Sequence, residues 1–244
     1  MKRVLGCIRR ADERYHMLQD GDSVLVGVSG GKDSMLLMEG LKLYQQFSKV
    51  RFNLQAAMLD LGLNRSDTTA TEAFARNIGV PFSVIPTQIG EVVFHIRKES
   101  HPCALCAKLR RGALNNVAVE RGCNKVALGH NREDVLETFF MSLLYESRIN
   151  TFGPVTYMTR KEVTLIRPFV FLPEKYIQGV VKSRGIPVLP PNCPVAGTTK
   201  REEMKALIAH LCTLVPDAPE KMIHAIADTD KYGLWDRLRL PPEK

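Results

Sequence analysis

The six residues Ser29-Gly30-Gly31-Lys32-Asp33-Ser34 combine residue types that suit the binding of phosphate groups. Glycines let the backbone approach a ligand closely, and a helix that begins there presents free N–H groups and a positive dipole to an anion. Lys32 can neutralise phosphate charge, while Asp33 can cap the helix or help to hold Mg²⁺. The segment matches neither G-x-x-x-x-G-K-[ST] nor G-x-G-x-x-G. We therefore expect a nucleotide site of another class, with an ordinary glycine-rich turn as the structural alternative.

A second group, Cys103, Cys106 and Cys193, has the chemistry of metal ligands. Cys103 and Cys106 lie three residues apart at the start of a predicted helix, where Pro102 and the helix N-terminus favour thiolates. A dithiol redox pair is disfavoured, because the pair is not in a thioredoxin-like first βα unit. Zinc remains open, with His101 as a fourth ligand. An iron–sulfur cluster also remains open, and three thiolates on a [4Fe–4S] cluster would leave one iron free for an exogenous ligand.

The segment from Gly129 to Asp134, with the sequence GHNRED, follows a short apolar run at residues 125–128. If that run is a parallel strand, the segment lies at the edge of the sheet where ligands bind in open α/β folds. Gly129 permits close approach, and Asp134 can act as a general base or orient a substrate base. Capping by Asn131 or Asp134 is the structural alternative. Arg110, one helical turn after Cys106, is expected to stabilise a phosphate or an oxyanion.

The elements that must position these residues follow an alternating pattern of short apolar runs and longer helical segments. This pattern predicts an α/β fold with a doubly wound, mainly parallel sheet and a small C-terminal helical part. Residues 23–28 are apolar on both faces, as in a central parallel strand. Further strands are predicted at 54–59, 81–85, 125–128 and 163–168, and helices at 33–47, 68–78, after residue 102, at 133–145, 173–184 and twice within 198–235. We divide the chain into a basic segment (1–20), a nucleotide-binding domain that contains residues 29–34 (21–153) and a C-terminal part that completes the fold (154–244).

The composition is that of a globular protein, with 244 residues of which 45% are hydrophobic and 25% charged. No apolar run approaches the about 18–20 residues needed to cross a bilayer, and residues 1–16 lack the apolar core of a secretion signal, so we expect a cytoplasmic protein without membrane attachment. A reducing compartment makes disulfides unexpected. Cys7, Cys123 and Cys212 match no motif, and the last two are expected to be small buried side chains.

The net charge of +8 suits a polyanionic partner such as a nucleic acid. Much of the excess is local, which strengthens this expectation. The basic residues gather in three groups: Lys2, Arg3, Arg9, Arg10 and Arg14; Lys108, Arg110 and Arg111; and Lys200, Arg201 and Lys205.

Residues 29–34 resemble the PP-loop of the ATP-pyrophosphatase superfamily, which has the adenine nucleotide alpha hydrolase-like fold. Within it, residues 21–205 resemble the tRNA 2-thiocytidine synthetase (TtcA-type) family. Four segments carry the resemblance: Gly21-Asp22 with the PP-loop, Cys103-Ala104-Leu105-Cys106, residues 129–134, and Pro191-Asn192-Cys193. Many relatives have two aspartates where this chain has Glu133-Asp134. The paired zinc-binding cysteine motifs of the 2-thiouridine relatives are absent from the sequence.

The resemblance implies an enzyme that adenylates the C2 oxygen of a tRNA pyrimidine with MgATP, releases pyrophosphate and then replaces the oxygen with sulfur. Sulfur would be delivered on a [4Fe–4S] cluster carried by Cys103, Cys106 and Cys193, and a cysteine desulfurase or sulfide would be the donor. Asp134, Lys32 and Arg110 would be catalytic, and a homodimer is implied. The nucleotide would contact Ser29, Gly30, Gly31, Lys32, Asp33, Ser34, Asp60, Leu61, Gly129 and His130.

Two other functions fit the same residues. The first is a PP-loop sulfurtransferase that acts on a tRNA uridine or on a small molecule. The second is a non-catalytic ATP-binding regulator with structural zinc. Metal and sulfide content would separate the zinc protein from the cluster enzyme, and pyrophosphate release would separate an enzyme from a binder.

Overall fold

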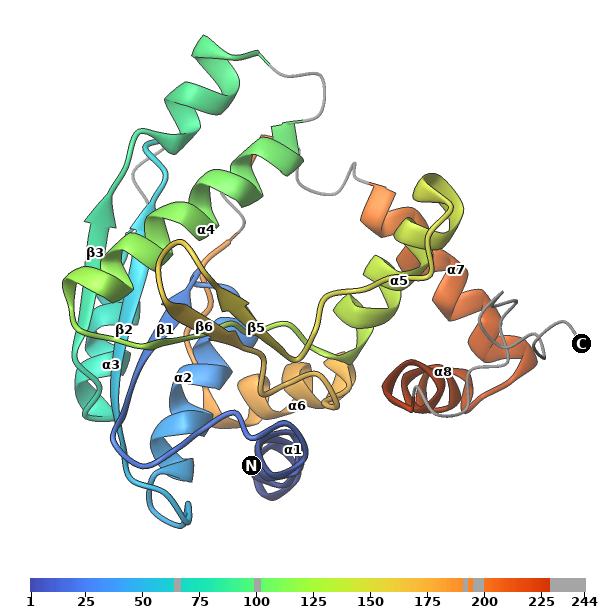
Figure 1. Cartoon of the computed structure of the whole chain (residues 1–244), viewed down its shortest axis with the longest axis horizontal. Coiled ribbons are helices and arrows are strands. Elements are labelled where there is room, and N and C mark those ends of the chain that lie inside the picture. Colours follow the sequence, from blue (N-terminus) through green and yellow to red (C-terminus); the bar gives the residue numbers. More distant parts are fainter. Residues whose placement is uncertain (64–66, 99–101, 191–192, 195–199, 229–244) are drawn as a thin grey trace, which may run out of the picture.

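The computed structural model describes the chain except for residues 64–66, 99–101, 191–192, 195–199 and 229–244. Its centre is a six-stranded sheet in the order β3-β2-β1-β4-β6-β5 (Figure 1). Every neighbouring pair is parallel except β5 and β6, so the predicted mainly parallel sheet is confirmed. The strands are β1 (Asp22–Val28), β2 (Phe52–Asp60), β3 (Phe82–Pro86), β4 (Lys125–Ala127), β5 (Val155–Met158) and β6 (Val163–Ile166).

Helices cover both faces of the sheet because its central strand, β1, has apolar side chains on both faces. Val24, Val26 and Val28 of β1 join the core beneath one set of helices, whereas Leu25 packs in the core beneath α4. α4 (Pro102–Glu120) and a π-helical segment (Glu91–Ile96) are in contact on the second face. The first face carries α1 (Lys2–Tyr15), α2 (Lys32–Tyr44), α3 (Thr69–Asn77) and α6 (Glu174–Arg184).

The strand order places residues 29–34, which follow β1, beside residues 129–134, which follow β4. From β1 the chain winds outward through β2 and β3, and then returns through α4 to β4 on the other side of β1. Val26 of β1 aligns with Ala127 of β4, so these strands end at the same edge. This reversal is the point where ligands bind in open α/β sheets.

The C-terminal part of the chain extends the sheet and then covers one side of that edge. Strands β5 and β6 continue the sheet past Gly153, and β6 pairs with β4. The helices α5 (Arg132–Glu146), α7 (Lys200–Leu214) and α8 (Ala218–Ala227) pack on one another (Figure 1). Within the described residues, no helix has the length and apolar character needed to span a bilayer.

Candidate active site at the carboxyl edge of the sheet

The loop between β1 and α2 is held in shape by its own serine side chains. Ser34 Oγ donates to the Gly31 carbonyl (2.9 Å) and accepts from the Ser29 N–H (3.0 Å). Gly30 has φ +79°, a backbone conformation that costs a residue with a side chain about 1–2 kcal/mol. Its carbonyl accepts a hydrogen bond from Leu189 N (2.9 Å). These contacts fix the loop before any ligand binds.

The N-terminus of α2 and Lys32 provide the positive charge of the loop. The N-cap residue is Gly31, which has no side chain to occupy the first N–H groups of the helix, so these remain available to a phosphate. Lys32 Nζ lies 2.8 Å from both Asp33 Oδ2 and Glu174 Oε1. Partial burial lowers the pKa of Lys32, but hydrogen bonds to Asp33 and Glu174 outweigh this effect and raise it above its ordinary value. Lys32 is therefore a cation held between two carboxylates.

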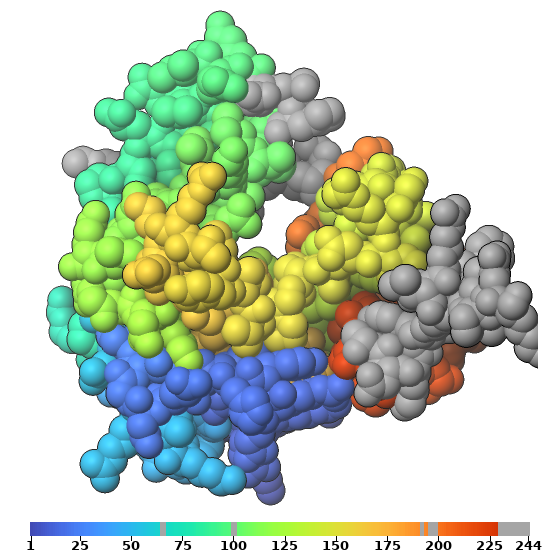
Figure 2. Space-filling model, viewed as in Figure 1, coloured from blue at the N-terminus to red at the C-terminus, as the bar shows by residue number. Residues whose placement is uncertain are grey.

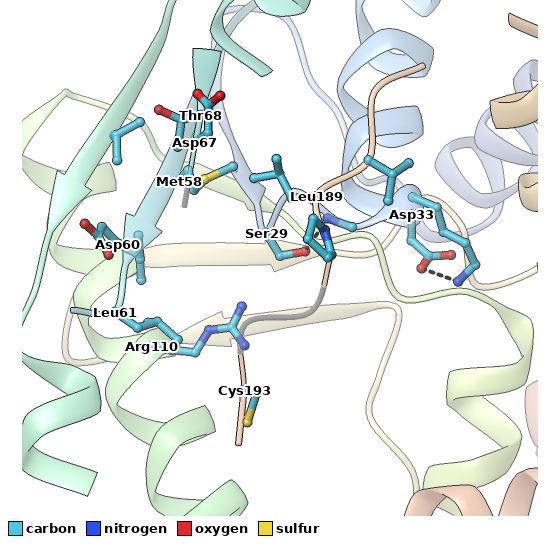
Figure 3. A pocket seen from close by; sticks show the side chains of 16 residues that line it. Ser29, Asp33, Met58, Asp60, Leu61, Asp67, Thr68, Arg110, Leu189 and Cys193 are labelled. Atoms are coloured by element: carbon cyan, nitrogen blue, oxygen red, sulfur yellow. Dashed lines mark hydrogen bonds and ion pairs between the residues drawn. The ribbon is translucent and has the colours of Figure 1, made fainter. Parts of the chain in front are cut away.

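A cavity of about 810 Å³ opens directly beside this loop (Figure 3). It contains two of the predicted adenosine contacts, Asp60 and Leu61, at the end of β2. Arg110 of α4 points into the cavity, and Cys193 lies at its wall. The wall is formed by Ser29, Gly31, Lys32, Asp33, Met58, Leu59, Asp60, Leu61, Asp67, Thr68, Val84, Arg110, Val188, Leu189, Pro190 and Cys193.

Gly129, the third predicted adenosine contact, supports the loop from behind instead of lining this cavity. A Cβ at this position would come within 3.0 Å of both Asp33 C and Ser34 N, so only glycine allows the end of β4 to pack on the start of α2. Asn131 strengthens the same junction, since its Nδ2 donates to Asp33 Oδ1 (3.0 Å). His130 likewise lies outside this cavity and faces an adjacent one.

Both carboxylate oxygens of Asp134 interact with other groups of the protein. Its Oδ2 accepts from Asn131 N (2.9 Å), and Asn131 Oδ1 accepts from Asp134 N (3.2 Å), which completes a capping box at the start of α5. Its Oδ1 is paired with Arg201 of α7 (2.8 Å). Arg201 also lies 3.4 Å from Glu137, whose pKa is raised to about 7 by burial and by the nearby Asp134 charge. The capping geometry anticipated from the sequence is thus present, and an arginine is added to it.

The three cysteines approach one another from two distant segments. Cys106 is half-buried, and Cys103 and Cys193 are exposed. Burial raises the pKa of the Cys106 thiol, Arg110 lowers it, and Cys193 and Cys103 raise it. Within the described ranges, no three His, Cys, Asp or Glu side chains form a group that could hold a metal ion. The assignment of Cys103, Cys106 and Cys193 as ligands therefore stays a prediction from the sequence. His101, Pro191 and Asn192 lie outside the described residues.

Two charged residues of the site were not assigned a role from the sequence. Glu174 binds Lys32, and Arg201 binds Asp134. Arg201 belongs to the basic group at 200–205, which the sequence predicts to contact nucleic acid, and Glu174 belongs to no motif. Lys205 of that group pairs with Glu174 (3.1 Å). Of the remaining cysteines, Cys123 is buried as expected, and Cys7 and Cys212 are partly buried.

Comparison with known proteins agrees with this geometry. The sequence matches the PP-loop domain family over residues 7–189. It is 32% identical to the tRNA-cytidine(32) 2-sulfurtransferase of Alkalilimnicola ehrlichii, over 97% of this chain and 76% of the relative. It is also 32% identical to the protein of the same name from Syntrophotalea carbinolica, over 91% of this chain and 87% of the relative.

Among solved structures, the U34-tRNA thiolase NcsA from Methanococcus maripaludis, determined with its [4Fe-4S] cluster, has the same fold. It superposes with a TM-score of 0.77 over 92% of this chain and 77% of that chain, at 24% identity. The sequence identities to the curated relatives, together with the PP-loop match, show that the chain belongs to the PP-loop family and, within it, to the family of the tRNA-cytidine(32) 2-sulfurtransferases.

Proposed function

We propose that this protein is an ATP-dependent tRNA sulfurtransferase that converts a cytidine to 2-thiocytidine. The observation that carries this function is the shared cavity, whose wall contains the PP-loop, Arg110 and Cys193. An ATP-binding loop and a sulfur-carrying thiol would line the same cavity if one substrate reacts first with ATP and then with sulfur. The family relationship supports tRNA as that substrate.

The PP-loop residues 29–34 bind the triphosphate of ATP. The free N–H groups at the start of α2 and the ammonium of Lys32 offset its negative charge. Asp33 carries a carboxylate for Mg²⁺. The adenosine lies against Asp60 and Leu61 at the far side of the cavity.

The reaction begins with attack of the cytosine C2 oxygen on the α-phosphorus of ATP. A new O–P bond forms, the bond to the bridging oxygen breaks, and pyrophosphate leaves. The oxygen then departs as part of AMP when sulfur attacks C2. Arg110 offsets the charge on the phosphate in both steps, because its guanidinium reaches into the cavity. Asp134 accepts the proton that is released when sulfur replaces oxygen.

A [4Fe–4S] cluster held by Cys103, Cys106 and Cys193 would supply the sulfur, since three thiolates leave one iron without a protein ligand. Free sulfide, or the persulfide of a cysteine desulfurase after reduction to sulfide by a thiol, would replenish that sulfur between turnovers. The active protein is a homodimer.

The test is purification without oxygen, followed by measurement of iron, sulfide and zinc, and by mass spectrometry of nucleosides from tRNA incubated with protein, ATP and sulfide. We expect about four iron and four sulfide per chain, together with 2-thiocytidine, AMP and pyrophosphate. Cys193→Ala should lose metal, sulfide and thiolation while ATP affinity is unchanged. Cys212→Ala is the matched control and should keep the metal, the sulfide, the thiolation activity and the ATP affinity. Zinc without sulfide would point to the zinc-stabilised alternatives, and ATP binding without pyrophosphate release would point to a regulator.

A further inference from the structure

A second cavity, of about 510 Å³, adjoins the ATP cavity and has no role in the steps above. The two cavities share Ser29, Leu59 and Arg110 in their walls. The second extends beneath α4 toward α5, and the molecular surface is hollowed between these helices (Figure 2). Its volume lies within the range of small-molecule sites, about 300–1,000 Å³.

Three buried polar side-chain atoms of residues that line this cavity have no hydrogen-bond partner. They are Asn115 Oδ1, His130 Nδ1 and Arg167 Nε, and they account for three of the four such side-chain atoms in the described part of the chain. Asn115 is only 3% exposed and Arg167 only 6%. Buried polar groups in folded proteins are nearly always paired. Three unpaired ones around a single cavity therefore indicate a polar ligand.

The cavity is positively charged, which suits a group carried by a polyanion such as RNA. Arg110, Arg111, Arg167 and Arg201 line it, and no Asp or Glu is among the described residues of its wall, although Arg201 is already paired with Asp134 and Glu137. Within the same described ranges, Arg167 forms no ion pair within 4 Å; its NH1 donates to the Gly153 carbonyl (2.6 Å) and to Thr156 Oγ1 (3.1 Å). A buried guanidinium without a carboxylate partner keeps its unpaired Nε–H as a donor for an acceptor atom of a ligand.

The walls also suit a flat ring. The ring of Phe152 lies 4.9 Å from the ring of His130, and the Arg167 guanidinium lies 4.9 Å from its centroid. Leu114, Leu128 and Leu165 complete an apolar lining. Aromatic, arginine and leucine side chains beside unpaired polar atoms are what a splayed-out RNA base requires.

We propose that this second cavity receives the target base of the RNA, and that Asn115 and Arg167 select cytosine over uracil. Asn115 Oδ1 accepts from the cytosine N4 amino group, and Arg167 Nε donates to N3 on the same edge, which leaves the C2 oxygen free to react. Uracil has an acceptor, O4, in place of the amino group and an N–H at N3, so it would face the Asn115 oxygen with an oxygen. This assignment rests on the proposed function.

The position of the cavity fits the chemistry. Because Ser29 and Arg110 belong to both walls, a base in the second cavity can turn its C2 oxygen toward the α-phosphate in the first. His130 supplies a third polar atom. Burial, together with the nearby Arg167 and Arg201, lowers the pKa of His130 to about 4, so the ring is neutral at pH 7 and has one nitrogen free to accept.

The test compares Asn115→Leu, a substitution of similar size, with Asn116→Leu on the next, exposed position of α4. Each protein is titrated with fluorescent anticodon stem-loops that carry cytosine or uracil at position 32, and its melting temperature is measured. We expect the preference of the wild type for cytosine to fall about tenfold in Asn115→Leu, the value of one lost hydrogen bond of about 1.4 kcal/mol, and to persist in Asn116→Leu. The melting temperature of Asn115→Leu should equal or exceed that of the wild type, because Oδ1 has no partner to lose. Arg167→Lys, which keeps the charge and removes Nε, should show the same loss of preference.

An unchanged cytosine preference in both cavity variants would overturn the assignment, even if the wild type produces 2-thiocytidine. Loss of preference accompanied by a lower melting temperature in Asn115→Leu would assign Asn115 to the fold and overturn its role in selection. A cytosine preference that depends on Asn115 in a wild type that forms no thiolated nucleoside would support the cavity and refute the proposed function. If thiosulfate, but neither stem-loop, protects the wild type from melting and this protection is lost in Asn115→Leu, the cavity binds a sulfur donor and the base assignment fails.

Discussion

Asp134→Asn separates the two roles that the structure gives this carboxylate. Asp134 Oδ2 caps α5 through the Asn131 N–H, and Oδ1 binds Arg201. An asparagine retains an oxygen for the cap but cannot accept a proton in catalysis. An alanine removes the cap and the acid together, so the pair of variants distinguishes a structural effect from a chemical one.

The expected magnitudes differ widely for the two roles. Losing a cap costs about 1 kcal/mol, and the pair with Arg201, whose side chain is 42% exposed, contributes at most about 1 kcal/mol after solvent screening. Asp134→Ala should therefore lower the melting temperature by about 2–8 °C, because each 1 kcal/mol corresponds to about 2–4 °C for a chain of this size. Removal of a general base lowers kcat by about 100- to 10,000-fold. Asp134→Asn should show the second effect with little of the first.

The assay measures kcat for thiolation at saturating ATP and tRNA, the Kd for ATP and the melting temperature. We expect a loss in kcat with the Kd for ATP unchanged. Glu133→Gln is the matched control, since it removes one charge from the same helical turn while its side chain faces Arg132 and the Glu174 N–H. If Asp134→Asn keeps activity within about threefold of the wild type, far below the effect of losing a base, Asp134 only caps the helix.

Three further substitutions test the surroundings of Asp134 and of the PP-loop. Glu137→Gln should gain stability relative to the wild type as pH rises, by up to about 3 kcal/mol at pH 8. The folded-state pKa of Glu137, about 7, lies above the unfolded value of 4.5, so the wild type loses stability as the buried carboxylate ionises. Urea unfolding of both proteins at pH 5 and pH 8 measures this difference, and parallel pH profiles of stability would contradict the prediction. Gly129→Ala should weaken ATP binding at least about tenfold, since its Cβ would force apart backbone atoms 3.0 Å away. Gly179→Ala in α6 has no neighbour within 4 Å and should instead stabilise the protein by about 0.5–1 kcal/mol without affecting ATP titrations.

The central strands and the helices between them could be predicted from the sequence because their signals are local. The apolar run at 23–28 became β1 (Asp22–Val28), and the predicted helix at 173–184 became α6 (Glu174–Arg184). The first helix, α1, was not predicted, since its apolar stripe is narrow and its charged residues dominate the composition. The edge strand β5 was also missed, because it is short and only partly buried.

In the candidate site, residues of one motif could be assigned together, whereas partners from different motifs could not. The serines, glycines and lysine of the PP-loop belong to one turn, and their types imply a phosphate site. The pairs of Lys32 with Glu174 and of Asp134 with Arg201 join helices that are distant in sequence. No spacing rule connects such residues, so only the fold shows that Arg201 and Lys205 of the basic group at 200–205 neutralise site carboxylates.

The segment that carries Cys193 is attached directly to the PP-loop. Leu189 N donates to the Gly30 carbonyl (2.9 Å), and the Leu189 side chain lies where a Cβ on Gly30 would be, 2.7 Å from its Cδ1. The positive φ of Gly30 turns the loop at this same residue. Leu189 and Cys193 line the same cavity as Ser29 and Lys32. The contact between Leu189 and Gly30 therefore also holds the segment of Cys193 beside the loop. The absence of a side chain at Gly30 thus serves the nucleotide loop and the approach of the cysteine segment at once.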